Sequence, residues 1–392
     1  MENVVIIDAS RTPMGSFGGK LKSLTAPELG AIAIGALYKN NSLNPDVIDE
    51  VVMGNVFSAG VGQAPARQAA LKAGLSNKTP SSTVNKVCAS GMKAIMYAAQ
   101  QIQTGDADVV VAGGMESMSN VPYYVHSARF GNKLGHTDMQ DGIIRDGLCD
   151  AFTHAYMGRF AEKCAEKYDI SREEQDNYAA MSYRRARRAR DEGAFNEEVT
   201  PVKIREGRTR AEVIGDDEEM DRVNFDKIPK LSPSFQKEGT VTAANASPIS
   251  DGAAAVLLMS ERKAKQLDLT PVARILSHAS TAQEPEWFTT APSKAIPAAL
   301  DRAGLKSGDI GLFEINEAFS VVALANMALL DLDPDIVNVH GGAVSMGHPV
   351  GCSGARIFVT LIHALRRYEK QRGCAAICNG GGGASAIITE LI

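Results

Sequence analysis

Cys88 stands where a cysteine can become a nucleophile. It lies in the segment Val-Asn-Lys-Val-Cys-Ala-Ser-Gly-Met, directly before a stretch with helical periodicity over 89–103. The free N–H groups and the positive dipole end of a helix N-terminus favour a thiolate over a thiol. A small buried apolar side chain would suit the same position. By itself the segment therefore predicts either a nucleophile or a core residue.

His348 is placed so that its imidazole can be presented to a ligand. It lies between glycines and directly before a proline, in Ser-Met-Gly-His-Pro-Val-Gly. Proline biases the preceding residue towards extended backbone, and glycines permit a tight turn. Histidine is the usual group that takes a proton from a cysteine nucleophile. A structural histidine is the alternative that this segment leaves open.

Two further segments follow predicted strands. In Cys378-Asn-Gly-Gly-Gly-Gly383, four glycines can aim backbone N–H groups at an anionic oxygen, although a tight turn would explain them equally well. In Asn316-Glu-Ala-Phe319, the amide could hold a water or a carbonyl oxygen, or serve only in a turn.

The elements that carry these groups are those of an α/β protein, because short β-branched runs alternate with helical stretches. The expected strands are 4–8, 50–53, 108–112, 272–276, 311–315 and 375–378. The expected helices are 27–40, 89–103, 294–302 and 354–368.

The order of landmarks repeats along the chain. A Thr-Ala-Pro helix start is followed by a strand ending in asparagine, at Asn55 and again at Asn316. Cys88 and His348 then occur at nearly the same spacing, and each is followed by a helix and a strand ending in glycines. We interpret this as a duplicated α/β unit, with coincidence between generic units as the alternative.

Between the two halves lies a polar, arginine-rich region. We expect an N-terminal half over 1–118, completed by 248–271, an inserted loop domain over 119–247 and a C-terminal half over 272–392. The run of arginines over 184–190 is typical of a solvated helix face, or it could attract a phosphate-bearing ligand.

Composition narrows the function classes. The 392 residues include 41 Lys and Arg against 46 Asp and Glu, a net charge of −5, which argues against a general nucleic-acid binder. The apolar runs are too short for a membrane span. Six cysteines without a CxxC pair predict free thiols rather than a disulfide scaffold or a structural metal. Without a recognisable leader, a cytoplasmic protein is expected, and a processed mitochondrial chain would look the same.

Four segments, taken in order, resemble the signatures of the thiolase family across essentially the whole chain. They are Val87-Cys-Ala-Ser-Gly-Met92, Asn316-Glu-Ala-Phe319, Gly347-His-Pro349 and Cys378-Asn-Gly-Gly-Gly-Gly383. The resemblance implies the thiolase fold: a five-layer αβαβα sandwich of two similar halves with an inserted loop domain. Within the family, Ala243-Ala-Asn-Ala-Ser247 and Tyr156-Met157 resemble the short-chain acetoacetyl-CoA thiolases.

The resemblance also implies an acetyl-CoA C-acetyltransferase. Such an enzyme condenses two acetyl-CoA to acetoacetyl-CoA and CoA, and runs the reverse thiolysis, by a ping-pong route through acetyl-Cys88. His348 would deprotonate Cys88 and later polarise a thioester oxygen, and Cys378 would remove the C2 proton of the second acetyl-CoA. Asn316 would hold a water that joins His348 in one oxyanion hole, and the N–H groups of Cys88 and Gly380 would form another.

Ligand contacts follow from the same resemblance. Coenzyme A is expected as a substrate and product, with no covalently bound cofactor, against Tyr183, Arg222, Val223, Asn224, Lys227, Ser247, Met157, Phe288 and Phe319. A potassium ion, as in the potassium-activated mitochondrial type, would be held by Tyr183, Ala243, Ala244, Ala246 and Val344. A homotetramer, a dimer of dimers, is implied, with 123–142 as the candidate contact.

Three other functions remain as alternatives at this stage. A β-ketoacyl synthase-like condensing enzyme shares the fold but usually pairs its cysteine with two histidines. A cysteine hydrolase could use Cys88, Asn316 and His348, but it leaves Cys378 without a task. A non-catalytic acyl-CoA-binding protein would bind the thioesters without exchanging acetyl groups.

Overall fold

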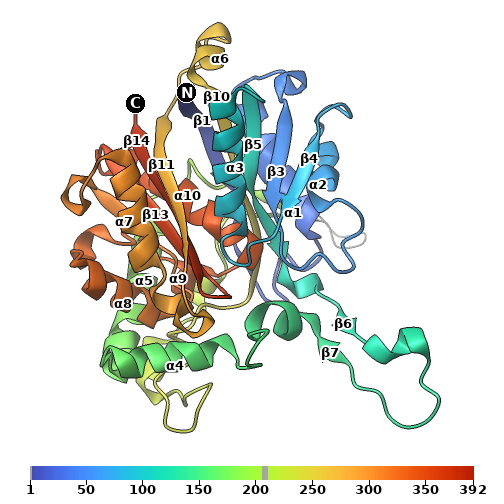
Figure 1. Ribbon diagram of the computed structural model, residues 1–392, viewed down its shortest axis with the longest axis vertical. Coiled ribbons are helices and arrows are strands. Elements are labelled where there is room, and N and C mark those ends of the chain that lie inside the picture. The colour runs from blue at the N-terminus through green and yellow to red at the C-terminus, as the bar shows by residue number, and fades with distance from the viewer. Residues whose placement is uncertain (1, 205–210) are drawn as a thin grey trace.

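The computed structural model describes residues 2–204 and 211–392, and its main feature is one large mixed sheet built from two half-sheets (Figure 1). The first runs in the order β4 (Ser81–Val84), β3 (Glu50–Gly54), β5 (Val109–Ser117), β10 (Ser250–Ser260) and β1 (Val4–Arg11), with β2 (Gly15–Ser16) paired to β10. The second runs in the order β11 (Ala273–Ala282), β14 (Gly383–Leu391), β13 (Arg372–Asn379) and β12 (Leu312–Ile315). β1 and β11 join them through two residue pairs.

Helices form the other layers. α3 (Ser90–Thr104) and α10 (Val350–Arg367) lie between the half-sheets and share one apolar core with both. α1 (Ala26–Asn40) and α2 (Pro65–Ala73) cover the outer face of the first half-sheet. α7 (Pro292–Ala303) and α8 (Ser320–Leu330) cover the outer face of the second. The expected αβαβα layering is therefore present, and α6 (Glu261–Gln266) and α9 (Ala343–Met346) complete the two halves.

The two halves repeat the same local topology. In each half a parallel strand pair, β3 with β5 or β12 with β13, is extended by an antiparallel strand, β10 or β14. The central helix of each half begins two residues after the residue singled out by sequence, since α3 starts after Cys88 and α10 after His348. The predicted duplication is confirmed in these elements.

The expected strands and helices are all present, with shifted ends. α10 begins at Val350 instead of residue 354, although Gly351 and Gly354 have low helix propensity. The helix is buried on nearly every side, so packing decides where it starts. In the part of the chain that the structure describes, no helix combines the length and the apolarity needed to cross a bilayer.

The segment between β5 and β10 holds two helices and a projecting arm. α4 (Met157–Lys167) and α5 (Arg172–Asp191) pack near the C-terminal half, and β8 (Val202–Ile204) pairs with β9 (Glu212–Ile214). β6 (Tyr123–Tyr124) and β7 (Gln140–Asp141) form the base of an arm that extends away from the body (Figure 1).

The arginine run on α5 is only partly a solvated face, which corrects the expectation from sequence. Arg185 donates to the carbonyls of Val337 and Pro334, and Arg187 donates to the carbonyl of Met220. Because guanidinium groups can satisfy several carbonyl acceptors at once, these side chains anchor α5 to neighbouring loops.

Candidate active site

The N-termini of α3 and α10 meet at a cavity of about 420 Å³. Its lining includes Cys88 and His348, and also Gly380 from the glycine-rich loop. Four of the residues expected to contact coenzyme A lie on its walls: Met157, Ser247, Phe288 and Phe319. Segments distant in sequence are thus brought together as predicted.

Cys88 sits on a strained turn. The preceding Val87 has φ 48°, a left-handed conformation that is rare for a β-branched residue. The Ser90 hydroxyl holds this turn by donating to the Val87 carbonyl at 2.6 Å and accepting from the Lys86 N–H at 2.8 Å. Strain of this kind persists only where the surroundings impose it, and it often marks a functional group.

Burial raises the pKa of Cys88 to about 11, opposite to the direction expected from its place at a helix N-terminus. The backbone N–H groups of Gly380 and of Cys88 itself face the sulfur and lower the pKa in part, and the charge of Glu116 raises it further. Loss of hydration outweighs the helix dipole here. The resting group is therefore a thiol that needs a base.

His348 can be that base. Burial, with a smaller contribution from Arg356, lowers the pKa of His348 to about 3, so the ring is neutral at pH 7. Its Nδ1 lies 2.6 Å from the Ser353 hydroxyl, which also lies 2.9 Å from the Pro349 carbonyl. Because the hydroxyl has one proton to give to that carbonyl, Nδ1 carries the ring N–H. Nε2 then keeps a lone pair, and it is buried without a partner among the residues described.

Ser353 was missed by the sequence analysis. It lies in the first turn of α10, five residues after His348, where its hydroxyl can reach both the ring and the Pro349 carbonyl. The signal that could have found it is a serine at this spacing from a histidine just before a helix, a weak signal without the structure.

Cys378 is the penultimate residue of β13 and is fully buried. Burial raises the pKa of Cys378 well above its usual range, and the charge of a Cys88 thiolate raises it further. Cys378 is enclosed by protein and is not itself among the residues that line the cavity of Cys88 and His348. Cys378 shares an apolar cluster with Phe288 and Phe319, which line the cavity.

Asn316 follows β12 directly, and its backbone N–H donates to the Ala376 carbonyl at 3.0 Å. Its side chain is 1% exposed, and neither its Oδ1 nor its Nδ2 has a partner in residues 2–204 and 211–392. Buried amides are normally hydrogen-bonded, so this one is suited to hold a ligand atom or a water.

The glycine-rich loop turns sharply after β13. Gly381 and Gly382 have φ of 83° and 84°, which favours glycine, and the Asn379 side chain donates to the Gly380 carbonyl at 2.8 Å. The turn leaves the Gly380 N–H facing the Cys88 sulfur. Two N–H groups, of Gly380 and Cys88, can therefore donate to an oxygen on an acyl group carried by that sulfur.

Most of the remaining predicted contacts lie outside the cavity lining. Arg222, Asn224 and Lys227 are exposed near two short 3₁₀ turns. Val223 and Tyr183 belong to a separate apolar cluster with Val344. Of the three alanines predicted as potassium ligands, Ala243 and Ala246 line the cavity and Ala244 is buried.

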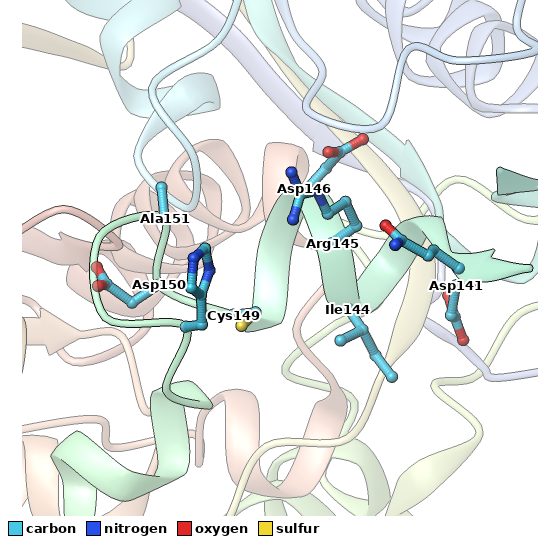
Figure 2. Close-up of a pocket in the computed structure, with 9 residues that line it drawn as sticks. Asp141, Ile144, Arg145, Asp146, Cys149, Asp150 and Ala151 are labelled. Carbon is cyan, nitrogen blue, oxygen red and sulfur yellow. The ribbon is translucent and has the colours of Figure 1, made fainter. Parts of the chain in front are cut away.

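A second hollow lies at the base of the arm and holds none of the predicted groups. Figure 2 shows Cys149 and Asp150 on one side of it and Arg145 and Asp141 on the other. The Asp150 Oδ2 accepts hydrogen bonds from the Phe152 N–H and from the N–H and hydroxyl of Thr153, which hold the turn after Cys149.

Comparisons with known proteins identify the family. Residues 4–262 match the N-terminal domain of thiolases and residues 269–391 match the C-terminal domain. The chain is 54% identical over 392 residues to acetyl-CoA acetyltransferase 2 of Arabidopsis thaliana, covering 100% of this chain and 97% of the relative. It is 54% identical over 393 residues to the mitochondrial acetyl-CoA acetyltransferase of Rattus norvegicus, covering 100% and 92%. The crystal structure of the Acat5 thiolase from Ascaris suum in complex with coenzyme A superposes with a TM-score of 0.94, at 46% identity and full coverage of both chains.

Proposed function

This chain belongs to the thiolase family, and we propose that its acyl transfer runs through a thioester on Cys88, with His348 and Cys378 as the acid–base groups. It has the thiolase fold and is an acyltransferase, an acetyl-CoA C-acetyltransferase. It condenses two acetyl-CoA to acetoacetyl-CoA and CoA by a ping-pong route, and it runs the reverse thiolysis.

The first half-reaction forms acetyl-Cys88. Nε2 of His348 takes the thiol proton as the sulfur attacks the thioester carbon of acetyl-CoA, and the N–H groups of Cys88 and Gly380 donate to the developing oxyanion. The carbon–sulfur bond to CoA breaks, and Cys378 protonates the departing thiolate. This leaves His348 as an imidazolium beside a Cys378 thiolate, and each charge offsets the cost of the other.

The second half-reaction forms the carbon–carbon bond. The Cys378 thiolate removes a C2 proton from the second acetyl-CoA, and the enolate oxygen accepts from Nε2–H of His348 and from a water held by Asn316. The enolate carbon attacks acetyl-Cys88, the bond to the sulfur breaks, and His348 returns its proton to Cys88. Every proton is accounted for, because CoA gains the one that C2 loses.

One observation carries this proposal: a neutral imidazole with a free Nε2 lies in the same cavity as Cys88, whose sulfur faces the Gly380 N–H. The test is to measure the two half-reactions separately in Cys88→Ser and in Cys378→Ser. The β-ketoacyl synthase, hydrolase and non-catalytic alternatives each leave Cys378 without this proton transfer.

Ser353 is expected to hold the reactive tautomer of His348. Ser353→Ala leaves the buried Nδ1–H unpaired, a cost of about 1–3 kcal/mol, so kcat should fall about 10- to 100-fold with KM nearly unchanged. Steady-state thiolysis of acetoacetyl-CoA measures both constants. Wild-type kcat in this variant would show that the Ser353 contact does not orient the ring.

We also propose a potassium ion near Tyr183 and Val344. Both pack in one cluster, and burial raises the pKa of Tyr183, with further contributions from the charges of Glu219 and Glu317. The buried Glu317 carboxylate is held by neutral donors, including the Val344 N–H at 3.0 Å. A hydroxyl and carbonyl oxygens beside an uncompensated carboxylate suit a hard cation. When bound, the ion would supply positive charge and fix the loop that carries the three predicted alanine ligands.

The potassium proposal predicts an ion-specific stability. At matched ionic strength, the unfolding temperature and the thiolysis rate should both be higher in K⁺ than in Na⁺. A ligand at a hundred times its Kd stabilises by about 2.7 kcal/mol. Tyr183→Phe should remove the difference between the two salts. Equal unfolding temperatures of the wild type in K⁺ and Na⁺ would end this proposal.

Coenzyme A is expected to enter beside Met157 and Ser247, with its nucleotide towards the exposed Arg222, Asn224 and Lys227. The pantetheine would pass the Ser247 hydroxyl, which donates to the Ala318 carbonyl at 2.8 Å. Phe288 and Phe319 would pack against the acyl group. The bound coenzyme A named for the Ascaris relative supports this ligand class.

The arm supports the proposal of a homotetramer, a dimer of dimers. Phe130 is 88% exposed and Leu134 is 100% exposed, and Tyr123 and Met139 are also largely exposed. Large apolar side chains gathered on a projecting segment are typical of a surface that another chain covers. Segment 123–142 is therefore our candidate contact. The cytoplasm remains the predicted location, with a processed mitochondrial form as the variant that the rat relative's name suggests.

A further inference from the structure

The duplicated halves carry a second strand-end pair equivalent to Asn316 and Cys378. In the parallel pair of each half, the last residue of the shorter strand faces an equivalent position: Gly54 of β3 faces Gly114 of β5, and Ile315 of β12 faces Ala376 of β13. One residue beyond the shorter strand stands an asparagine in each half, Asn55 or Asn316. On the longer strand, the residue two positions after this pair is Glu116 in the first half and Cys378 in the second. Glu116 is therefore the counterpart of Cys378.

The Glu116 carboxylate is completely buried and accepts four hydrogen bonds. Oε1 accepts from the Asn55 side-chain amide at 2.5 Å and from the Phe57 N–H at 3.2 Å. Oε2 accepts from the Val56 N–H at 3.0 Å and from the Gly351 N–H at 2.8 Å. All four partners are N–H donors, which only an ionised carboxylate can satisfy together.

These donors lie next to both catalytic residues, His348 and Cys88. Gly351 lies in the first turn of α10, three residues after His348. Val56 and Phe57 belong to an apolar cluster that also includes Cys88 and Val350. One buried side chain thus connects the start of the helix behind His348 to the loop that packs against Cys88.

The surrounding backbone leaves little room for adjustment. A Cβ on Gly54 would lie 2.5 Å from the Gly91 nitrogen in the first turn of α3. A Cβ on Gly114 would lie 2.1 Å from the Gly351 carbonyl oxygen, and a Cβ on Gly351 would lie 2.6 Å from the Glu116 Oε2. Interiors packed this closely transmit a small displacement instead of absorbing it.

We propose that Glu116 is a positioning residue for catalysis, which holds the start of α10 against the N-terminal half and so fixes Nε2 of His348 relative to the Cys88 sulfur. The proposal rests on the roles assigned to Cys88 and His348 above. In each half, the strand-end pair serves the helix start of the other half: Asn316 and Cys378 act at Cys88, and Glu116, itself held by Asn55, accepts from the Gly351 N–H in the first turn of α10.

The placement of this charge also affects the nucleophile. The carboxylate is buried without a cationic partner among its four donors, and burial raises the pKa of Glu116 to about 7 despite the hydrogen bonds. Its charge raises the pKa of Cys88. Removal of the charge should therefore lower the pH midpoint for alkylation of Cys88 by iodoacetamide, an effect that a loss of packing alone would not produce.

Glu116→Gln is the direct test, because it keeps the size of the side chain but turns an NH₂ group towards N–H donors. We expect kcat for acetoacetyl-CoA thiolysis to fall about 100-fold, the effect of a misplacement of about 1 Å, with KM within about threefold. Asp251→Asn is the matched control. Asp251 is a buried carboxylate on the adjacent strand β10, but the groups that donate to it belong to Ser119 and Met118, after the end of β5, and not to Val56, Phe57 or Gly351. Its kcat should stay within about twofold of the wild type, in line with the small effects of changes that leave the site untouched.

Glu116→Asp provides a milder second variant if the glutamine variant does not fold. It keeps the charge but is too short to reach all four donors, so an intermediate loss of kcat is expected without the lower alkylation midpoint. The positioning role is wrong if a folded Glu116 variant keeps wild-type kcat, or if Asp251→Asn loses as much kcat as Glu116→Gln. A wild-type enzyme that forms no acetyl-Cys88 would instead overturn the proposed function itself.

Discussion

Cys88→Ser is expected to remove acyl-enzyme formation and nearly all turnover. A serine hydroxyl is a much weaker acid than the Cys88 thiol, and neutral His348, whose pKa is lowered to about 3, is too weak a base to activate it. Loss of a nucleophile in a catalytic unit can lower kcat by about 10⁶-fold. Incubation with acetyl-CoA followed by intact-mass measurement should show an added acetyl group on the wild type and none on the variant.

Cys149→Ser is the control for this change. Cys149 is half-buried in the hollow at the base of the arm, so the same exchange of sulfur for oxygen occurs outside the Cys88 cavity. It should leave acetylation and kcat unchanged. Acetylation of Cys88→Ser at the wild-type rate would show that the acetyl group is carried elsewhere.

Cys378→Ser is expected to separate the half-reactions. Acetylation of Cys88 should continue, because CoA departs as a thiolate that solvent can protonate. Removal of the C2 proton should nearly stop, because serine is a far weaker acid–base group, and general acid–base catalysis contributes about 10²–10⁴-fold. Condensation and thiolysis should therefore fall by about that factor while acetyl-enzyme accumulates.

Cys374→Ser is the matched control for this change. Cys374 is a buried cysteine four residues earlier on β13, but it packs in the outer core of the C-terminal half, whereas Cys378 packs with Phe288 and Phe319, which line the cavity. Its variant should retain both half-reactions, although burial of a hydroxyl costs stability. If Cys378→Ser condenses acetyl groups at the wild-type rate, the division of labour between the cysteines is wrong.

Much of this site could be predicted from sequence, because its groups stand at the ends of regular elements. Cys88 and His348 precede helices, and Asn316 and Cys378 lie at strand ends. The short patterns left structural alternatives open at these positions, and the proposed roles came from the resemblance to thiolases. The duplication was also visible, since equivalent landmarks occur in the same order in both halves. The fold carries these ends to one edge of the sheet, where the two central helices begin.

Other features left little local signal. β10 and β14 were not predicted, because alanine, glycine and serine take up much of both and have weak strand propensity; pairing with neighbouring strands makes them strands. α8 is apolar on nearly all sides, so it lacks the polar face that reveals a helix in sequence.

The pKa values of the site residues depend on how deeply each group is buried, and the sequence does not show this. The helix dipole at Cys88 favours a thiolate, yet the loss of water around the sulfur has the larger effect and raises its pKa. Glu116 lies near the end of β5, two residues after Gly114, in a segment without a catalytic pattern of its own, and only its four donors reveal its importance.

The most direct test of the central claim is a single-turnover experiment with isotopically labelled acetyl-CoA, read by peptide mapping and by exchange of C2 hydrogens with deuterated solvent. The proposed mechanism predicts the label on Cys88 in both the wild type and Cys378→Ser, with exchange at C2 in the wild type alone. Label on any other residue, or full C2 exchange in Cys378→Ser, would contradict it.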